Sequence, residues 1–246
     1  MYAYAFEYKS MFSKLFQQEN FKDNIAVVSI GCGNMIDYWG LVEAFEKIGN
    51  DTCKIKYKGI DTIDWNYKVE KREEDIVRFI EGNAATVFSK VSSLTSDVYI
   101  FPKSISEFSN QEFQEICDGF SQKKILKDRV HVLISLRSDQ ASMKRDVERS
   151  RKIVSALEQN GFVTKDDAGV YWHYENEDRG INKMDQTFEY PNEAIDLLSS
   201  LSEACYTYVN EGENCTDDCQ NLNRWPVLKA RNIRYQILSF DRKDLS

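Results

Sequence analysis

The sequence is poor in proline and glycine and has no long hydrophobic run. Of its 246 residues only 3 are proline and 11 are glycine, whereas 42% are hydrophobic, which excludes a disordered, collagen-like or coiled-coil chain. No apolar stretch of about 18 residues occurs, so we expect no transmembrane helix and no membrane partner. The N-terminus carries Glu7 and Lys9 among aromatic residues and lacks the apolar core of a signal peptide. These absences predict a cytoplasmic protein.

Cysteine is also too scarce for a disulfide-stabilised fold. Six cysteines in an intracellular chain of this length predict free thiols. Cys205, Cys215 and Cys219 lie close enough together to suggest zinc, but a structural zinc site normally has four ligands, and no fourth one follows them. The sequence therefore favours no metal site.

Short β-branched runs alternate with segments of helical periodicity through the first two thirds of the chain. Strands are predicted near residues 25–30, 55–60, 77–80, 98–101 and 130–136. Helices are predicted near residues 84–93, 109–124 and 142–160, with another that ends at Gly49. This alternation predicts βαβ units and a doubly wound, mainly parallel, Rossmann-like α/β sheet.

An aromatic stripe opens the chain at helical spacing and consists of Tyr4, Tyr8, Phe12 and Phe16. We expect residues 1–24 to form an N-terminal helix that packs in the core. Two alternatives are a partner interface, which exposed aromatic residues favour, and contact of Tyr4 or Tyr8 with a ligand.

Beyond residue 161 the alternation stops. Strands predicted near residues 170–174 and 233–238 are separated by a long segment that holds a predicted helix near residues 192–209. The expected organisation is a core of residues 25–183, an insertion of residues 184–223 and a final strand within residues 224–246.

The insertion is strongly acidic. Residues 184–223 include nine acidic residues and no lysine or arginine, so this segment carries a charge of -9. Because the net charge of the chain is -8, the remaining residues together carry a charge of +1. We expect this segment either to repel phosphate locally or to contact a basic protein partner. Because the remaining chain is nearly neutral, a nucleic-acid acceptor stays possible, although no motif supports one.

A glycine-rich loop follows the first predicted strand. Gly31 and Gly33 let the backbone turn sharply and let a ligand approach without a Cβ in the way. A dinucleotide fingerprint would have a small residue where Ile36 stands, so a pyrophosphate-bearing cofactor is disfavoured. Asp61 ends the second predicted strand, where a carboxylate can accept hydrogen bonds from ribose hydroxyls. The loop and the acid together predict a nucleoside site.

Three segments in this order and spacing resemble motifs I, II and III of class I S-adenosylmethionine-dependent methyltransferases: residues 28–34 (VSIGCGN), 59–61 (GID) and 81–84 (EGNA). The resemblance covers about residues 25–140. It implies S-adenosylmethionine as cofactor and a seven-stranded sheet with an antiparallel last strand. It also implies that the methionine moiety lies near Gly31 and Gly33 and the ribose on Asp61. The adenine is expected near Ile63, Asn83 and Ala84.

The sequence departs from the family where an acid usually precedes the first glycine, because Ser29 stands there and Asp37 is the nearest replacement. The residues expected to bind the cofactor are Ser29, Gly31, Cys32, Gly33, Asn34, Asp37, Asp61, Ile63, Asn83, Ala84 and Phe101.

The resemblance places the acceptor chemistry after the fourth predicted strand. Lys103, Ser104 and Glu107 are the candidate catalytic residues there, and the alternative is that they only begin the next helix or lie in solvent. Members that methylate exocyclic amines of nucleic acid carry a Pro-Pro pair here, and those that methylate pyrimidine C5 use a cysteine. This sequence has neither at that place, so the acceptor is unassigned.

Histidine is scarce too, and charged residues cluster in two places. Of the two histidines, His131 is expected in the core, and His173 is expected to pack against aromatic neighbours rather than act as a base. Basic residues within 137–152 are expected on a solvated helix face, and those within 224–234 near the rim where substrate enters.

Two functions from different classes remain open. The first is an S-adenosylmethionine-dependent methyltransferase. The second is a methyltransferase-like structural or regulatory subunit that binds the nucleoside or a protein partner without catalysis. A nicotinamide-dependent oxidoreductase is disfavoured by Ile36.

Overall fold

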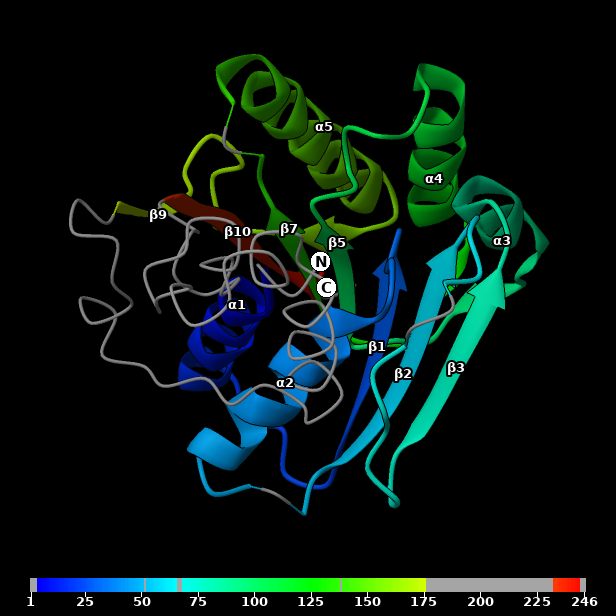
Figure 1. Ribbon diagram of the computed structural model, residues 1–246. Coiled ribbons are helices and arrows are strands. Elements are labelled where there is room, and N and C mark those ends of the chain that lie inside the picture. Colours follow the sequence, from blue (N-terminus) through cyan, green and yellow to red (C-terminus); the bar gives the residue numbers. More distant parts are fainter. Residues whose placement is uncertain (1–3, 51, 66–67, 138, 176–231, 244–246) are drawn as a thin grey trace, which may run out of the picture.

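The computed structural model describes residues 4–50, 52–65, 68–137, 139–175 and 232–243 (Figure 1). The main sheet consists of β1 (Asn24–Ile30), β2 (Lys54–Asp61), β3 (Ile76–Glu81), β5 (Val98–Pro102), β7 (Arg129–Ser135), β8 (Phe162–Val163), β9 (Trp172–Glu175) and β10 (Asn232–Arg242). A second, small sheet pairs β4 (Ser93–Leu94) with β6 (Lys124–Ile125). The helices are α1 (Ala5–Gln18), α2 (Ile36–Lys47), α3 (Ala84–Lys90), α4 (Asn110–Gln122) and α5 (Gln140–Gln159).

The strand order of the main sheet is β3-β2-β1-β5-β7-β10-β8, with β9 paired to β10. The five strands from β3 to β7 are parallel, whereas β10 runs antiparallel to β7, β8 and β9. The central strands are buried on both faces, which is why β1, β5 and β7 are nearly continuous apolar runs. The expected doubly wound sheet with an antiparallel last strand is confirmed.

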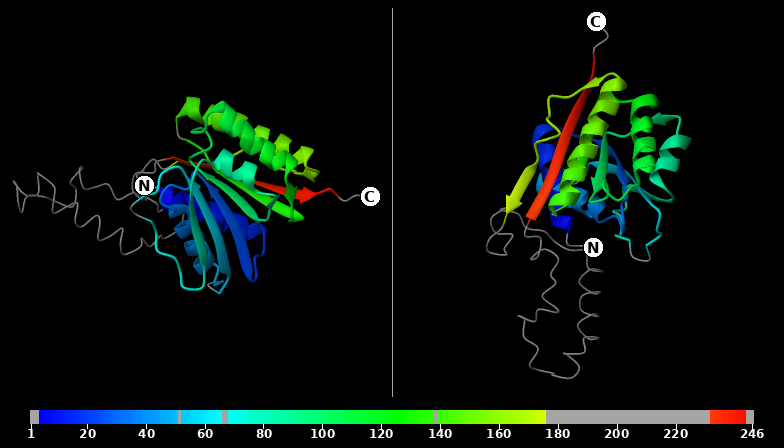
Figure 2. Two further views of the ribbon diagram at one scale, coloured as in Figure 1. Left: turned by 90° about the vertical axis from the view of Figure 1, so that its right-hand side faces the viewer. Right: turned by 90° about the horizontal axis from the view of Figure 1, so that it is seen from above.

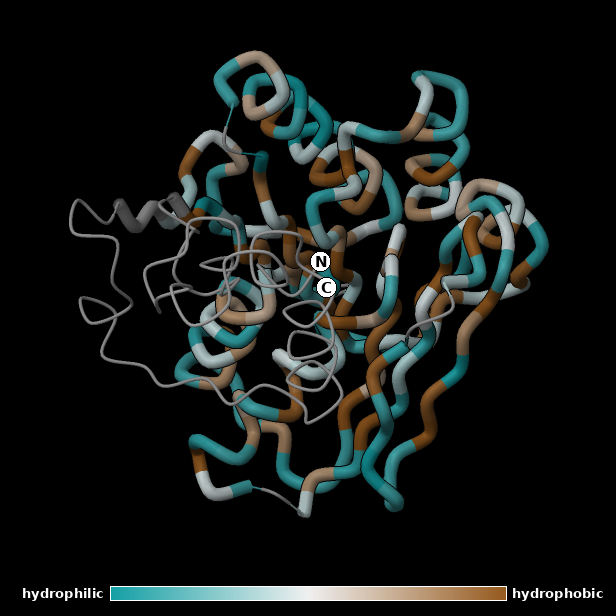
Figure 3. Tube along the Cα trace, in the orientation of Figure 1, coloured by the Kyte–Doolittle hydropathy of each residue, from teal (hydrophilic) through white to brown (hydrophobic). Residues whose placement is uncertain are grey.

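The helices cover the two faces of the sheet separately. Helices α1 and α2 share one hydrophobic core with the sheet, and α3, α4 and α5 share the other (Figures 1 and 2). Apolar segments gather along the central strands, and the outward faces of the helices are hydrophilic (Figure 3). No helix in these described ranges is long and apolar enough to cross a bilayer.

The aromatic stripe of α1 packs in the core as expected, apart from one residue. Tyr8 and Phe12 are buried, as are Met11 and Leu15 on the same face, whereas Tyr4 is 41% exposed. Phe16 stacks on Phe45 of α2 with 4.2 Å between ring centroids. The helix therefore joins the core rather than offering an aromatic surface.

All the strands and helices predicted within the described residues exist, with ends displaced by a few residues. Helix α3 is shorter than expected because it ends at Lys90 rather than near residue 93. Strand β8 and the β4–β6 pair are not predicted, because a strand of two residues has no readable period. The predicted helix near residues 192–209 and the insertion lie outside the described residues, as do Cys205, Cys215 and Cys219.

A loop rather than a helix connects β2 to β3 in the residues described there, 62–65 and 68–75. Asp75 anchors this loop because its carboxylate accepts hydrogen bonds from the Ile55 amide at 2.8 Å and from the Tyr38 hydroxyl at 2.7 Å. Arg72 donates to the Cys53 carbonyl at 2.8 Å. The anchored loop lies against α2 and brings the segment after Asp61 close to the glycine-rich loop.

Candidate functional site

The glycine-rich loop connects β1 to α2 at the carboxyl edge of the sheet. Here β1 has β2 on one side and β5 on the other, so the strand order reverses, which is where open α/β sheets bind ligands. Gly31 and Gly33 have φ of 74° and 54°, in the left-handed region that favours glycine. The amides of Gly31 and Cys32 both donate to the Ile60 carbonyl, at 2.8 and 3.1 Å, which ties the loop to β2.

The two glycines differ in the space around them. A Cβ on Gly31 would lie 2.5 Å from the Cβ of Ser104, whereas a Cβ on Gly33 would have no heavy atom within 4 Å. Gly31 is therefore required for packing between the loop and the segment after β5. Gly33 faces open space that a ligand can fill.

Asp61 sits at the end of β2, beside this open space. One carboxylate oxygen accepts from the Gly33 amide at 2.8 Å, and the other accepts from the Ile63 amide at 3.0 Å. A carboxylate oxygen can accept more than one hydrogen bond, so both keep capacity for the two hydroxyls of a ribose. Ile63 is 53% exposed beside it and offers an apolar surface to a planar ring.

Asp37 lies beneath the loop, in the first turn of α2, and is fully buried. Its carboxylate accepts from the Tyr57 hydroxyl at 2.9 and 3.0 Å. Burial raises the pKa of Asp37 to about 6, and the hydrogen bond from the Tyr57 hydroxyl offsets part of this effect. Ser29 is also fully buried, and its hydroxyl has no hydrogen-bond partner among the described residues. The buried acid at the base of the site is therefore Asp37.

Other residues expected around the cofactor have structural partners. The Asn83 side chain caps α3 by accepting from the Ala85 amide at 2.9 Å, and its amide group donates to Glu112 at 2.5 Å. Ala84 is buried in the first turn of α3, at the carboxyl edge. Both therefore lie just after the end of β3, and the Asn83 side chain already holds hydrogen bonds in the structure.

Three further expected residues are buried. The Cys32 side chain packs on Gly59, and burial raises the pKa of its thiol far above the usual value. Asn34 is 1% exposed, its carbonyl accepts from the Val69 amide at 3.3 Å, and its side-chain nitrogen has no hydrogen-bond partner within the described part of the chain. Phe101 is fully buried in the core shared with α3, α4 and α5.

The segment after β5 brings Lys103 to a buried acid that the sequence did not single out. Lys103 has a φ of 61°, and its ammonium lies 2.9 Å from the carboxylate of Glu7 in α1. Glu7 also accepts from the Ser135 hydroxyl at 2.5 Å, at the end of β7. Burial raises the pKa of Glu7, and the Lys103 charge partly offsets this. The only sequence signal for Glu7 was a charged residue within an aromatic stripe.

The other two candidate catalytic residues have partners as well. The Ser104 hydroxyl donates to the Ile30 carbonyl, and the side chain packs against Gly31. Glu107 pairs with Arg137 and is largely exposed. All three candidate catalytic residues thus lie together beside the loop, but the side chain of each already forms an ion pair or a hydrogen bond within the protein.

The basic residues of α5 are not all solvated, contrary to expectation. Arg149 is 4% exposed and donates to the carbonyl groups of Ile105 and Phe108, at 2.5 and 2.7 Å. It therefore fixes the segment after β5 to α5, and the prediction of a fully solvated face is wrong at this residue. The stretch of residues 137–152 otherwise has several exposed positions.

His131 is a core residue, as expected. It is 2% exposed, its Nδ1 lies 3.0 Å from the Ser239 hydroxyl, and burial lowers its pKa to about 4. Cys32, Cys53 and Cys117 are free and buried. Within the residues that the structure describes, no group of three or more histidine, cysteine or acidic side chains could hold a metal ion.

The donor set fits a nucleoside better than a dinucleotide. A pyrophosphate needs the helix N-terminus after the first glycine loop, but here the buried Ile36 and the buried acid Asp37 occupy the first turn of α2. A carboxylate below the loop disfavours phosphate and favours a cationic group. The open space at Gly33, the Asp61 carboxylate and the exposed Ile63 suit a nucleoside with a positively charged substituent.

No protein-family model matches the sequence, and no curated protein matches it. The chain is similar to MNMC2 from Aquifex aeolicus, with 8% identity, a TM-score of 0.43 and coverage of 64% of this chain and 53% of that one. It is also similar to the plantazolicin methyltransferase BpumL in complex with SAH, with 12% identity, a TM-score of 0.43 and coverage of 98% and 85%. A third similar structure is the Burkholderia thailandensis 1,6-didemethyltoxoflavin-N1-methyltransferase, with 9% identity, a TM-score of 0.45 and coverage of 97% and 79%.

This chain spans little more than half of the length of MNMC2, at 53%. The low identities and TM-scores of 0.43 to 0.45 do not identify a family. The Rossmann-like fold class rests on the order and direction of the strands.

Proposed function

We propose that this chain is an S-adenosylmethionine-dependent methyltransferase. The observation that carries the proposal is the hydrogen bond of 2.8 Å from the Gly33 amide to Asp61, which joins the ends of β1 and β2 at the switch point of the sheet. It sets an acid with spare acceptor capacity next to the open space at Gly33. A nucleoside with its ribose on Asp61 would extend over Ile63 in one direction and over Gly33 in the other.

When bound, S-adenosylmethionine supplies a methyl group already activated by a sulfonium. The protein then has to hold the acceptor in line, and remove a proton where the acceptor carries one. Asp37 contributes a negative field below the loop, which favours the cationic end of the cofactor. Lys103, which follows β5, and Glu7 of α1, which accepts from Ser135 at the end of β7, form a polar wall on the acceptor side.

Calorimetric titration of the full chain with S-adenosylmethionine and S-adenosylhomocysteine tests the proposal. We expect saturable binding of both, and at least about tenfold weaker binding by Asp61→Ala, because two ribose hydrogen bonds to a charged acceptor are lost. Asp64→Asn is the matched control, since Asp64 follows in the same loop and its exposed carboxylate pairs with Lys68. Absence of binding by the wild type, or equal loss in both variants, would overturn it.

Methyl transfer is tested separately from binding. Incubation with methyl-labelled cofactor and fractionated lysate should label a protein, nucleic-acid or small-molecule fraction. Binding of the cofactor without any labelled product would favour the alternative, a module that keeps the nucleoside as a structural or regulatory ligand.

The organisation of the chain and its location form a further part of the proposal. We infer a cytoplasmic protein whose acidic residues 184–223 contact a basic partner, in addition to a core of residues 25–183 completed by residues 224–246. The support is the local charge, nine acids without lysine or arginine. Deletion of residues 184–223 without loss of a copurifying partner would contradict this role.

A further inference from the structure

Helix α3 is too short to cover the outer part of the sheet. It has 7 residues, whereas the neighbouring strands β2 and β3 have 8 and 6. On the face that α3 partly covers, β2 presents Lys54, Lys56 and Lys58 at alternate positions, and all of them are exposed. The part of this face that α3 leaves uncovered is therefore a basic surface.

A cavity of about 430 Å³ lies between α3 and this face. Its floor and walls are mainly apolar and include Val28, Ile60, Phe88 and Leu94, while Lys58 and Arg78 lie at its edge. The volume is within the range of about 300–1,000 Å³ that is common for sites of small molecules.

The cavity lies on the face of the sheet beneath α3, whereas the nucleoside is proposed to bind at the loop beyond the carboxyl edge. Its lining includes Ile60 and Ile80, near the carboxyl ends of β2 and β3, and continues past Val28 and Lys58 to Thr95 and Ser96, which come just before β5 begins at Val98. It therefore extends toward the amino ends of the strands, whereas the glycine-rich loop follows the carboxyl end of β1.

The two cations at the edge are adjacent, and within the part of the chain that the structure describes neither pairs with an acid. Lys58 and Arg78 are opposite each other in the register of β2 and β3, and like charges in such a pair disfavour the sheet. Among the described residues, neither forms an ion pair. An anion placed between them would relieve this repulsion.

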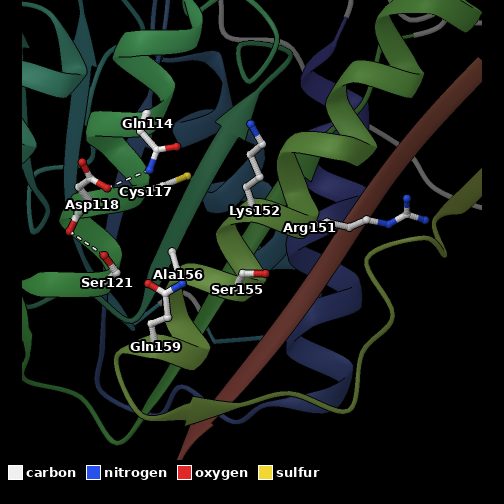
Figure 4. A pocket seen from close by; sticks show the side chains of 9 residues that line it. All are labelled: Gln114, Cys117, Asp118, Ser121, Arg151, Lys152, Ser155, Ala156 and Gln159. Carbon is white, nitrogen blue, oxygen red and sulfur yellow. Dashed lines mark hydrogen bonds between the residues drawn. The ribbon is translucent and has the colours of Figure 1, made fainter.

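We propose that this cavity binds a small amphiphilic anion, namely an alkyl or aryl group that carries a carboxylate, sulfate or phosphate. The apolar group lies on the floor of the cavity, and the anionic group lies between Lys58 and Arg78. The second cavity, about 300 Å³ between α4 and α5, does not suit such a ligand (Figure 4). Its lining is mostly polar, and Arg151 extends away from it toward Gly169.

Decanoate and decan-1-ol, titrated into the full chain, test the proposal, because the two share an apolar chain and differ in charge. We expect saturable binding of decanoate and at least about fivefold weaker binding of decan-1-ol, since charge-assisted contacts are lost. NMR shift changes should centre on Val28, Ile60 and Leu94. No saturable binding of decanoate, or equal binding of the alcohol, would overturn the proposal.

Charge variants distinguish this cavity from the basic surface as a whole. The double variant Lys58→Gln with Arg78→Gln should weaken decanoate binding about tenfold. Lys54→Gln with Lys56→Gln removes the same number of charges from the same face but does not touch the cavity lining, and should change binding less than about twofold. All four side chains are exposed, so both double variants should fold. Equal loss in the two variants would show binding to diffuse charge and contradict the proposal.

Discussion

The ammonium of Lys103 lies 2.9 Å from the carboxylate of Glu7, although 96 positions separate them in the sequence. This ion pair joins the first turns of α1 to the segment after β5. Glu7 is fully buried, and the Lys103 side chain is 14% exposed. The pair thus stabilises the position of α1 over the carboxyl edge, and it is part of the proposed acceptor side.

Removal of the Lys103 charge should leave the buried carboxylate of Glu7 without its ion-pair partner. We expect Lys103→Met to lower the free energy of unfolding by about 3 kcal/mol at pH 8, because a buried charge without its partner is costly. The loss should be smaller at pH 5. Burial already raises the pKa of Glu7, and without Lys103 the pKa rises further, so the carboxyl takes up a proton in the folded state as the pH falls. Urea unfolding at the two pH values measures both effects.

The double variant Glu7→Gln with Lys103→Met is the control. It removes both charges together and should recover stability to within about 1 kcal/mol of the wild type. If the two substitutions were simply additive, the pair would have no energetic coupling and this interpretation would be wrong.

The distance between Glu7 and Lys103 along the chain also marks the limit of what the sequence could predict. The alternation of strands and helices and the glycine-rich loop are local patterns, and they predicted the sheet and the end of β2 at Asp61. The partners of Lys103, Ser104 and Glu107 depend on contacts between distant elements, such as Ser104 with Ile30. No spacing encodes those contacts, so the sequence could place these residues near the site but could not show that each is already engaged.

Arg149 is a second instance of the same limit. Its neighbours on α5 are charged and mostly exposed, so helical periodicity predicts a solvated face. Only the tertiary packing brings Arg149 against backbone carbonyl groups in the segment after β5, where it donates to the Ile105 carbonyl at 2.5 Å.

The two loop glycines should respond differently to substitution. Gly33→Ala should cost about 1 kcal/mol, because it strains a positive φ of 54° but meets no neighbour. Gly31→Ala should cost about 3 kcal/mol, because the new Cβ also lies 2.5 Å from the Ser104 side chain. Adding Ser104→Gly to Gly31→Ala should recover part of the difference by removing the clash. Chemical denaturation measures all three, and equal costs at the two glycines would contradict the packing role of Gly31.

Asp37 should lower stability as the pH rises. Its folded pKa of about 6 lies above the ordinary value of 3.8, so the folded protein holds the proton more tightly than the unfolded chain. Stability from this group is therefore present below the ordinary pKa and decreases by about 3 kcal/mol as the pH rises to about 6. Asp37→Asn keeps an acceptor for Tyr57 and should be more stable than the wild type at pH 7.5 by about 2 kcal/mol. The same variant should bind S-adenosylmethionine more weakly, since it lacks the negative field below the loop.

Thermal melts between pH 4 and 8 measure the gain in stability of Asp37→Asn, and calorimetric titrations measure its loss of affinity for the cofactor. Tyr57→Phe is the control, because it keeps the acid and removes only the hydroxyl that donates to it. A less stable Asp37→Asn variant at pH 7.5 would show that the buried charge is better compensated than its raised pKa implies.

His131 should raise stability as the pH rises, which is opposite to the effect of Asp37. Burial and the nearby Arg129 charge lower its folded pKa to about 4, below the ordinary value of 6.5, so the unfolded chain binds the proton more tightly. Stability from this group is present above about pH 6.5 and decreases by about 3 kcal/mol as the pH falls to about 4. Between pH 4 and 6 it therefore offsets the slope that Asp37 produces, and the wild type should show a nearly flat profile from these two groups.

Each single variant should reveal the slope of the other group. In His131→Gln the stability should decrease as the pH rises from 4 to 6, and in Asp37→Asn it should increase over the same range. The double variant should be flat again, at a level set by the packing lost at position 131, where the imidazole contacts Phe21 with 6.0 Å between ring centroids. Urea unfolding of the four proteins at pH 4, 5 and 6 measures these slopes. If His131→Gln has the same slope as the wild type, the histidine is not buried in its neutral form.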